Sequence, residues 1–230
     1  INPNKLIIID YSDSTKIKNI KNKFYFKKSC VNKKNLTFIK NNTIPISFCL
    51  KQEVLDFSFH TKTSERDYDI SIFFDPYKNH GGSTFRYKMA KFINDNFKNY
   101  KIKVGLIGEN GKIGRNTIQE EYFEQMKNSK IIVTCNPDDW EGDYRLFESL
   151  SCKCLVFSDK MITPVINNFI DKKHLIYYDR NNLELLKENL LYYLNNKDLI
   201  NEISENGYLH TLKYHKPEDR ILEIINKINI

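Results

Sequence analysis

Residues 136 to 159 read NPDDWEGDYRLFESLSCKCLVFSD, and this stretch is the most informative part of the chain. A polar loop with one glycine leads into an apolar-periodic segment of two helical turns, and a short apolar strand follows. If the helix begins near Asp143, Arg145 lies in its first turn and Glu148 lies three residues further on. The two side chains then project from nearly the same face.

This arrangement has the chemistry of a nucleoside diphosphate site. A helix N-terminus and a guanidinium neutralise a pyrophosphate, and a carboxylate accepts hydrogen bonds from the two ribose hydroxyls. The alternative is an ordinary ion pair between Arg145 and Glu148 on the helix surface, which contributes only a few tenths of a kcal/mol. The loop favours the first interpretation, because Trp140 and four acidic residues are placed to meet hydroxyl groups. The four are Asp138, Asp139, Glu141 and Asp143.

Regular alternation of strands and helices extends on both sides of this stretch, from Tyr68 to the end of the chain. Expected strands cover residues 69–74, 102–107, 130–134, 154–157 and 174–178. Expected helices cover residues 85–97, 117–128, 144–151, 183–195, 197–213 and 217–228. Such alternation predicts an α/β fold, a Rossmann-like parallel sheet with helices on both faces, over residues 61–230. Ligands of these sheets bind where the loops follow the carboxyl ends of strands.

The first 60 residues have a different pattern. Short apolar runs at 5–10, 24–26 and 44–50 predict strands, separated by loops rich in Lys and Asn, and residues 52–67 resemble a linker. We therefore expect residues 1–60 to form a smaller N-terminal α/β lobe that contributes to the acceptor side.

Composition excludes several classes of protein. With 40% apolar residues among 230, the chain can bury a substantial core. It has no run of roughly 18 apolar residues and no signal-peptide pattern, so we expect a soluble cytoplasmic protein without a membrane span. The chain begins with Ile1 rather than Met, so further domains of a longer polypeptide are considered. The five cysteines form no CxxC pair, which argues against a disulfide framework or a zinc site.

The net charge of +7 suits a partner with phosphates, including nucleic acid. Lysines, however, are spread through the chain together with Asn and Ile, which is typical of a coding bias. Arginine is rare, and because its planar fork fits phosphate, each arginine is a better site candidate than any one lysine. We therefore expect no nucleic-acid partner.

Residues 142–157, GDYRLFESLSCKCLVF, resemble the donor-binding signature of GT-B glycosyltransferases, especially the exostosin-like and spore-maturation groups. Residues 121–133 and 207–220 are similar to the upstream helix and strand and to the closing helices of those families, so the resemblance covers about residues 68–220. It implies that Glu148 binds the ribose, that Arg145 binds the diphosphate, and that Trp140 to Asp143 lie near the transferred sugar, with Tyr144 beside them. The chain departs from the families at two positions. Glu141 and Glu148 are separated by six residues instead of seven, and Lys153 stands where glycine is usual.

Other candidates follow the remaining strands. Gly82, Ser83 and Arg86 could hold phosphate or flank the acceptor, and turn and capping duty is the equal alternative. Gly108 and Arg115 belong to the glycine-rich loop after the second strand of the larger domain, as donor contacts. Asp10, Asp13 and His80 are the candidate catalytic bases. The alternative is ordinary turn chemistry for Asp10 and Asp13, and a solvated loop histidine for His80.

The sequence thus predicts a glycosyltransferase, transferring a hexosyl or pentosyl group from a UDP- or GDP-sugar to a glycan, protein or lipid acceptor. No DxD motif follows a strand, so we expect no metal and no cofactor. The alternative from another class is a binding module for nucleotide sugars or glycans that keeps the fold without catalysis.

Overall fold

The computed structural model describes eleven stretches of the chain. They are residues 6–12, 15, 24–32, 37–38, 43–52, 54–55, 65–74, 84–105, 120–138, 141–163 and 166–228. Among these residues, no helix combines the length and apolar character that a membrane span requires.

A five-stranded sheet forms the centre of the larger domain. Its strands are β6 (Tyr68–Ile72), β7 (Ile102–Val104), β8 (Ser129–Val133), β9 (Leu155–Asp159) and β10 (Ile176–Tyr178). They lie in the order β10-β9-β8-β6-β7, and every neighbouring pair is parallel. Most residues of these strands are apolar or aromatic, because both faces of a parallel sheet are covered. The predicted Rossmann-like sheet is confirmed.

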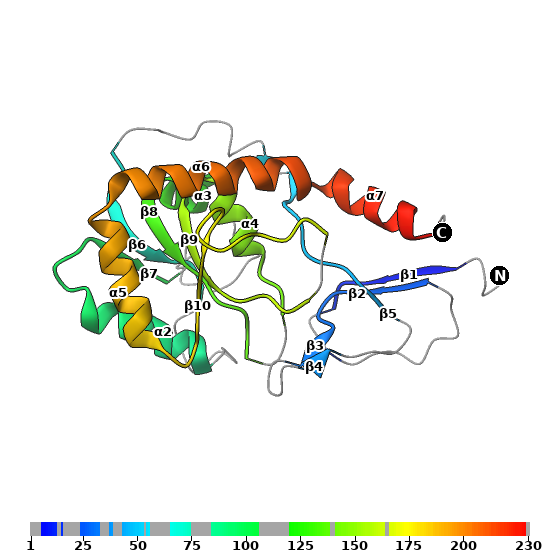
Figure 1. Cartoon of the computed structure of the whole chain (residues 1–230), viewed down its shortest axis with the longest axis horizontal. Coiled ribbons are helices and arrows are strands. Elements are labelled where there is room, and N and C mark those ends of the chain that lie inside the picture. Colours follow the sequence, from blue (N-terminus) through cyan, green and yellow to red (C-terminus); the bar gives the residue numbers. More distant parts are fainter. Residues whose placement is uncertain are drawn as a thin grey trace.

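Helices cover both faces of this sheet (Figure 1). On one face, side chains of α2 (Thr84–Asn96) and α5 (Leu183–Leu194) pack with alternate strand residues such as Ile131 and Val133. On the other face, α3 (Glu120–Lys127) and α4 (Tyr144–Ser151) pack with Ile132. The long helix α6 (Lys197–Tyr214) contacts α4, α5 and β9. The alternation of successive β8 residues between two cores is the period of two that a strand imposes.

The strand order creates a switch point between β6 and β8. From β6 the chain winds to β7 on one side, and from β8 it winds through β9 to β10 on the other side. In doubly wound sheets, the crevice for ligands lies at the carboxyl ends of the two strands where the winding direction changes. The loops after β6 and β8 therefore mark the place to look for a site.

The N-terminal residues form a smaller parallel sheet in the order β1-β2-β5, from β1 (Ile7–Asp10), β2 (Phe24–Lys27) and β5 (Thr43–Pro45). A two-stranded antiparallel ladder joins β3 (Val31–Asn32) to β4 (Thr37–Phe38). The expected strand over residues 44–50 is wrong beyond Pro45. Its partner β2 ends at Lys27, which pairs with Pro45, so the chain leaves the sheet there.

Two parts of the chain pass between the small N-terminal sheet and the larger domain, and they are hydrogen-bonded to each other. Leu50 N donates to His215 O at 2.8 Å, and Arg220 Nε donates to Phe48 O at 3.3 Å. Helix α7 (Pro217–Ile228) continues from the larger domain toward the β1–β2 sheet (Figure 1). Phe48 and Leu50 belong to the core under α3 and α4, so this segment already packs on the larger domain. The boundary near residue 60 stays a prediction.

Candidate functional site

Helix α4 begins at the switch point. Asp143 is its N-cap, with φ −138° and ψ 118°, and the Asp143 carboxylate accepts a hydrogen bond from Arg145 N at 3.1 Å. The preceding Gly142 has φ 133°, a conformation that glycine adopts without strain. The helix therefore starts where the sequence predicts, with Arg145 in its first turn.

Asp143 is buried and surrounded by donors. Its carboxylate accepts a hydrogen bond from the Thr134 hydroxyl and from Arg145 Nη1, and Arg86 Nη2 lies 3.7 Å from Oδ2. Burial by itself would raise the pKa of Asp143. The positive charges of Arg145 and Arg86 and the Thr134 hydrogen bond outweigh burial, so the pKa is lowered and the carboxylate is charged.

The two guanidinium groups hold the ends of the two switch-point strands. Arg145 Nε donates to Phe73 O at 2.6 Å, directly after β6, and Arg86 Nη2 donates to Cys135 O at 2.8 Å, shortly after β8. Burial opposes the charged form of Arg145, but the Asp143 carboxylate, together with Tyr122 and Glu148, outweighs burial and raises the Arg145 pKa. The side chains keep 15% and 16% exposure for Arg86 and Arg145. Two cations with partial access to solvent thus meet one carboxylate at a helix N-terminus.

Glu148 lies one turn further along α4 and is 2% exposed. Its Oε2 accepts a hydrogen bond from the Tyr122 hydroxyl at 2.8 Å, which fixes the orientation of the carboxylate. Arg145 forms its ion pair with Asp143. The alternative considered from the sequence was an exposed ion pair between Arg145 and Glu148 on the helix surface. The buried position of Glu148 does not agree with that alternative.

Glu141 and Tyr144 face other neighbours. The Glu141 carboxylate accepts hydrogen bonds from the backbone of Ile162 and from the backbone and hydroxyl of Thr163, in the loop after β9. Tyr144 packs on Phe48, with ring centroids 3.7 Å apart. It also borders a cavity of about 390 Å³ at the crossing between the two sheets, lined in addition by Tyr11, Cys49, Leu50, Lys51, Gln52 and Pro217.

Asp10 lies at the carboxyl end of β1, in a closed cluster of its own. Its carboxylate accepts hydrogen bonds from Tyr25 Oη at 2.7 Å and Ser12 N at 2.9 Å, and Lys27 Nζ lies 3.4 Å away. Burial opposes the charged form, but these donors outweigh it and hold the pKa of Asp10 well below its usual range. A carboxylate with a lowered pKa is a weak proton acceptor. Its catalytic role stays a prediction.

Seven other predicted site residues lie outside the described part of the chain. They are Asp13, His80, Gly82, Ser83, Gly108, Arg115 and Trp140. Within the described residues, no three His, Cys, Asp or Glu side chains are grouped as a metal site.

The sequence analysis missed several polar residues that follow the strands. Asp159 ends β9, and its Oδ1 accepts hydrogen bonds from Asn136 N at 2.8 Å and Asn136 Nδ2 at 3.0 Å. Arg180, after β10, donates to Asn136 O and to Asp138 Oδ1. Thr134, after β8, donates to Asp143 as described above. The available signal was their position at the end of a predicted strand or within two residues after it.

A family model described as "Glycosyl transferase-like" matches residues 73–226. No curated protein sequence matches the chain.

Solved structures share the fold at low sequence identity. An alpha-glucosyltransferase in complex with UDP and a 13-mer DNA aligns with TM-score 0.58 and 10% identity, over 90% of this chain and 65% of that one. A variant of S. aureus TarM in complex with UDP, alpha-GlcNAc-glycerol and fondaparinux aligns with TM-score 0.56 and 14% identity, over 84% and 41%. Sucrose-phosphate synthase from Thermosynechococcus elongatus aligns with TM-score 0.55 and 10% identity, over 85% and 54%.

The chain thus spans between 41% and 65% of the length of these three proteins. The family match covers more than half of the chain, includes the whole of α4 and both switch-point arginines, and agrees with the parallel sheet. The chain belongs to the glycosyl transferase-like family, and its Rossmann-like α/β domain shares its fold with the solved structures described above.

Proposed function

We propose that this chain is the nucleotide-sugar-binding part of a glycosyltransferase, which moves a hexosyl or pentosyl group from a UDP- or GDP-sugar to a glycan, protein or lipid acceptor. The observation that carries the proposal is the pair Arg86 and Arg145 at the N-terminus of α4, with Asp143 as their shared carboxylate. UDP in the solved structures of similar fold supports UDP as the first nucleotide to test.

The charge balance at this place favours an anion. A helix N-terminus carries a partial positive charge, which stabilises anions and repels cations. The two guanidinium groups exceed the Asp143 carboxylate by one positive charge. Burial of that charge is unfavourable. A diphosphate bound there would meet fork-shaped donors and the N–H groups of the first helical turn.

The same groups would assist the reaction. When the acceptor oxygen replaces the diphosphate at the sugar's anomeric carbon, the bond from that carbon to the diphosphate breaks and negative charge accumulates on the departing diphosphate. Fixed positive groups stabilise this charge in the transition state. Arg86 and Arg145 would supply this charge without a metal ion. Glu148, oriented by Tyr122, would accept hydrogen bonds from the ribose and set the depth at which the nucleotide lies.

A titration with UDP, followed by calorimetry, tests the donor site. Glu148→Gln keeps the shape and the hydrogen bond from Tyr122 but removes the charge that the ribose hydroxyls would meet, so we expect affinity to fall about tenfold. Glu188→Gln, an exposed residue of α5, is the matched control and should bind UDP as the wild type does. Equal affinity of Glu148→Gln and wild type would contradict the assignment.

One observation favours the second candidate, a binding module without catalysis. Asp10, the described candidate base, is a weak proton acceptor because Tyr25, Ser12 and Lys27 lower its pKa. Incubation of the purified chain with UDP-glucose and GDP-mannose, with and without added acceptor sugars, separates the two. Release of nucleotide supports a transferase, and tight donor binding without any release supports the binding module.

A further inference from the structure

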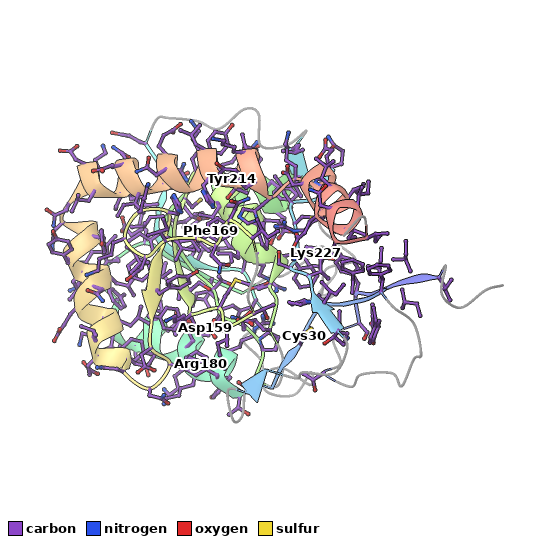
Figure 2. All side chains as sticks on the ribbon, turned by 45° about the vertical axis from the view of Figure 1, so that its right-hand side comes forward. Cys30, Asp159, Phe169, Arg180, Tyr214 and Lys227 are labelled. Atoms are coloured by element: carbon purple, nitrogen blue, oxygen red, sulfur yellow. The ribbon has the colours of Figure 1, made fainter. Side chains whose placement is uncertain are left out.

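Asn136, Asp159 and Arg180 lie at the ends of three neighbouring strands, β8, β9 and β10, or shortly after them. Hydrogen bonds and an ion pair connect the three residues, and this connected group is the relay. Asp159 accepts two hydrogen bonds from Asn136, as described above, and Arg180 Nε lies 3.8 Å from Asp159 Oδ2. Figure 2 shows the Asp159 and Arg180 side chains next to each other. Asn136 and Asp159 are 3% and 2% exposed, so water does not compete for these contacts.

Asn136 extends the relay to the start of α4. Its Oδ1 accepts a hydrogen bond from Gly142 N at 2.9 Å. Gly142 directly precedes the N-cap Asp143 and has a positive φ. The position of the Gly142 amide therefore sets where the helix begins and where its first turn points.

We propose that Asn136 and Asp159 are positioning residues for the donor diphosphate: they hold the Gly142 amide and thereby fix the N-terminus of α4, with Asp143 and Arg145, at the switch point. The inference rests on the proposed function in so far as it concerns the donor. In this proposal both residues act through the Gly142 amide.

The carboxylate of Asp159 gives the relay its direction. A carboxylate only accepts hydrogen bonds, so the Asn136 amide must turn its Nδ2 toward Asp159 and its Oδ1 toward Gly142. An apolar residue at 159 would leave the amide free to turn over. Arg180 donates to Asn136 O and Asp138 Oδ1, and its positive charge offsets the cost of burying Asp159.

A swap of the two side chains tests this relay. Asn136→Asp places a second carboxylate against Asp159, so we expect the Gly142 amide to exchange its hydrogen about tenfold faster and UDP to bind about tenfold more weakly. In the double variant Asn136→Asp/Asp159→Asn, the amide introduced at position 159 would donate to the carboxylate introduced at position 136, and that carboxylate would still accept from Gly142. Exchange and affinity should then both return toward the wild-type values.

Asp69→Asn is the matched control, because Asp69 lies near the amino end of β6 and accepts hydrogen bonds from Lys101 N and Lys130 Nζ. It should lower the melting temperature without changing Gly142 exchange or UDP affinity. The inference is overturned if Asn136→Asp lowers only the melting temperature, or if the swap restores neither quantity. A wild-type chain that binds neither UDP nor GDP contradicts the proposed function. The exchange rates of the unliganded variants then still decide whether the relay holds α4.

Discussion

Arginine side chains lie at both ends of α4. Their positive charge is favourable at the C-terminal end of the helix and unfavourable at the N-terminal end. At the C-terminal end, Arg66 donates to Cys152 O at 3.0 Å and to Lys153 O at 2.7 Å, and it also donates to Ser129 O at 2.6 Å, at the start of β8. Carbonyl groups at a helix C-terminus carry a partial negative charge, so a cation there stabilises the fold. At the N-terminal end, Arg86 and Arg145 lie at the positive end of the same helix, where cations are unfavourable.

This difference separates a structural arginine from a candidate functional one. Arg66 is explained by the carbonyl groups that it satisfies. Arg86 and Arg145 share the carboxylate of Asp143, and an anionic ligand would further offset the cost of holding two cations there. The position of an arginine relative to the helix dipole is therefore more informative than its presence.

The largest expected effect is on stability, at the C-terminal end. Arg66→Ala leaves three carbonyl groups without their charged donor, so we expect the free energy of unfolding to fall by about 2 to 3 kcal/mol. Urea unfolding measures this change. UDP affinity should stay the same once the variant is folded, and a loss of affinity comparable to that of an N-terminal variant would break the distinction between the two ends.

At the N-terminal end, the expected effect is on ligand affinity. Arg145→Ala should weaken UDP binding by about 2 kcal/mol, roughly 30-fold, because a charged hydrogen-bond donor to the diphosphate is lost. The loss should shrink as salt is added, since the site is partly exposed. Lys91→Ala, which removes an exposed cation of α2, is the control. If Arg145→Ala binds UDP normally at low salt, the cationic pair has no role in donor binding.

Low pH should lower the free energy of unfolding by protonating Asp143 at the N-terminal end of α4. Its folded-state pKa is lowered from 3.8, so its stabilising contribution is present above that pH and is lost as the pH falls further. We expect Asp143→Asn to cost about 1 kcal/mol at pH 6, as an N-cap loses its charge. The difference from wild type should shrink as the pH falls below 3.8. Glu202→Gln, exposed on α6, should show no such convergence, and a constant difference for Asp143→Asn would exclude this explanation.

The contrast between the two ends also explains what the sequence could predict. Gly142, Asp143 and Arg145 are neighbours in the chain, so local pattern located the helix start and its cation. Arg66 reaches the end of α4 from a segment that looked like a linker, 86 residues before Cys152. No local pattern signals such a contact.

The same reasoning applies to the relay and to the N-terminal sheet. Asn136 and Asp159 are 23 residues apart in sequence and meet only because β8 and β9 are adjacent. The wrong extension of β5 beyond Pro45 has a similar cause, because the length of a strand depends on its partner. Periodicity predicted the elements, whereas pairing between distant residues needed the fold.

The smallest expected effect concerns Lys153, at the position where the families that the sequence resembles usually have glycine. Lys153 has φ 54°, and the backbone bonds Lys153 N to Leu150 O and Cys154 N to Ser149 O form a Schellman motif. Lys153→Gly should remove about 1 kcal/mol of left-handed strain. It also loses the ion pair with Glu205 and the contact with the Tyr208 ring, so we expect a net gain of about 0.5 kcal/mol in unfolding free energy. Lys153→Ala loses the same contacts but keeps the strain and should be less stable than wild type. UDP affinity should change in neither variant. If both variants are equally destabilised, the positive φ of Lys153 has no energetic cost.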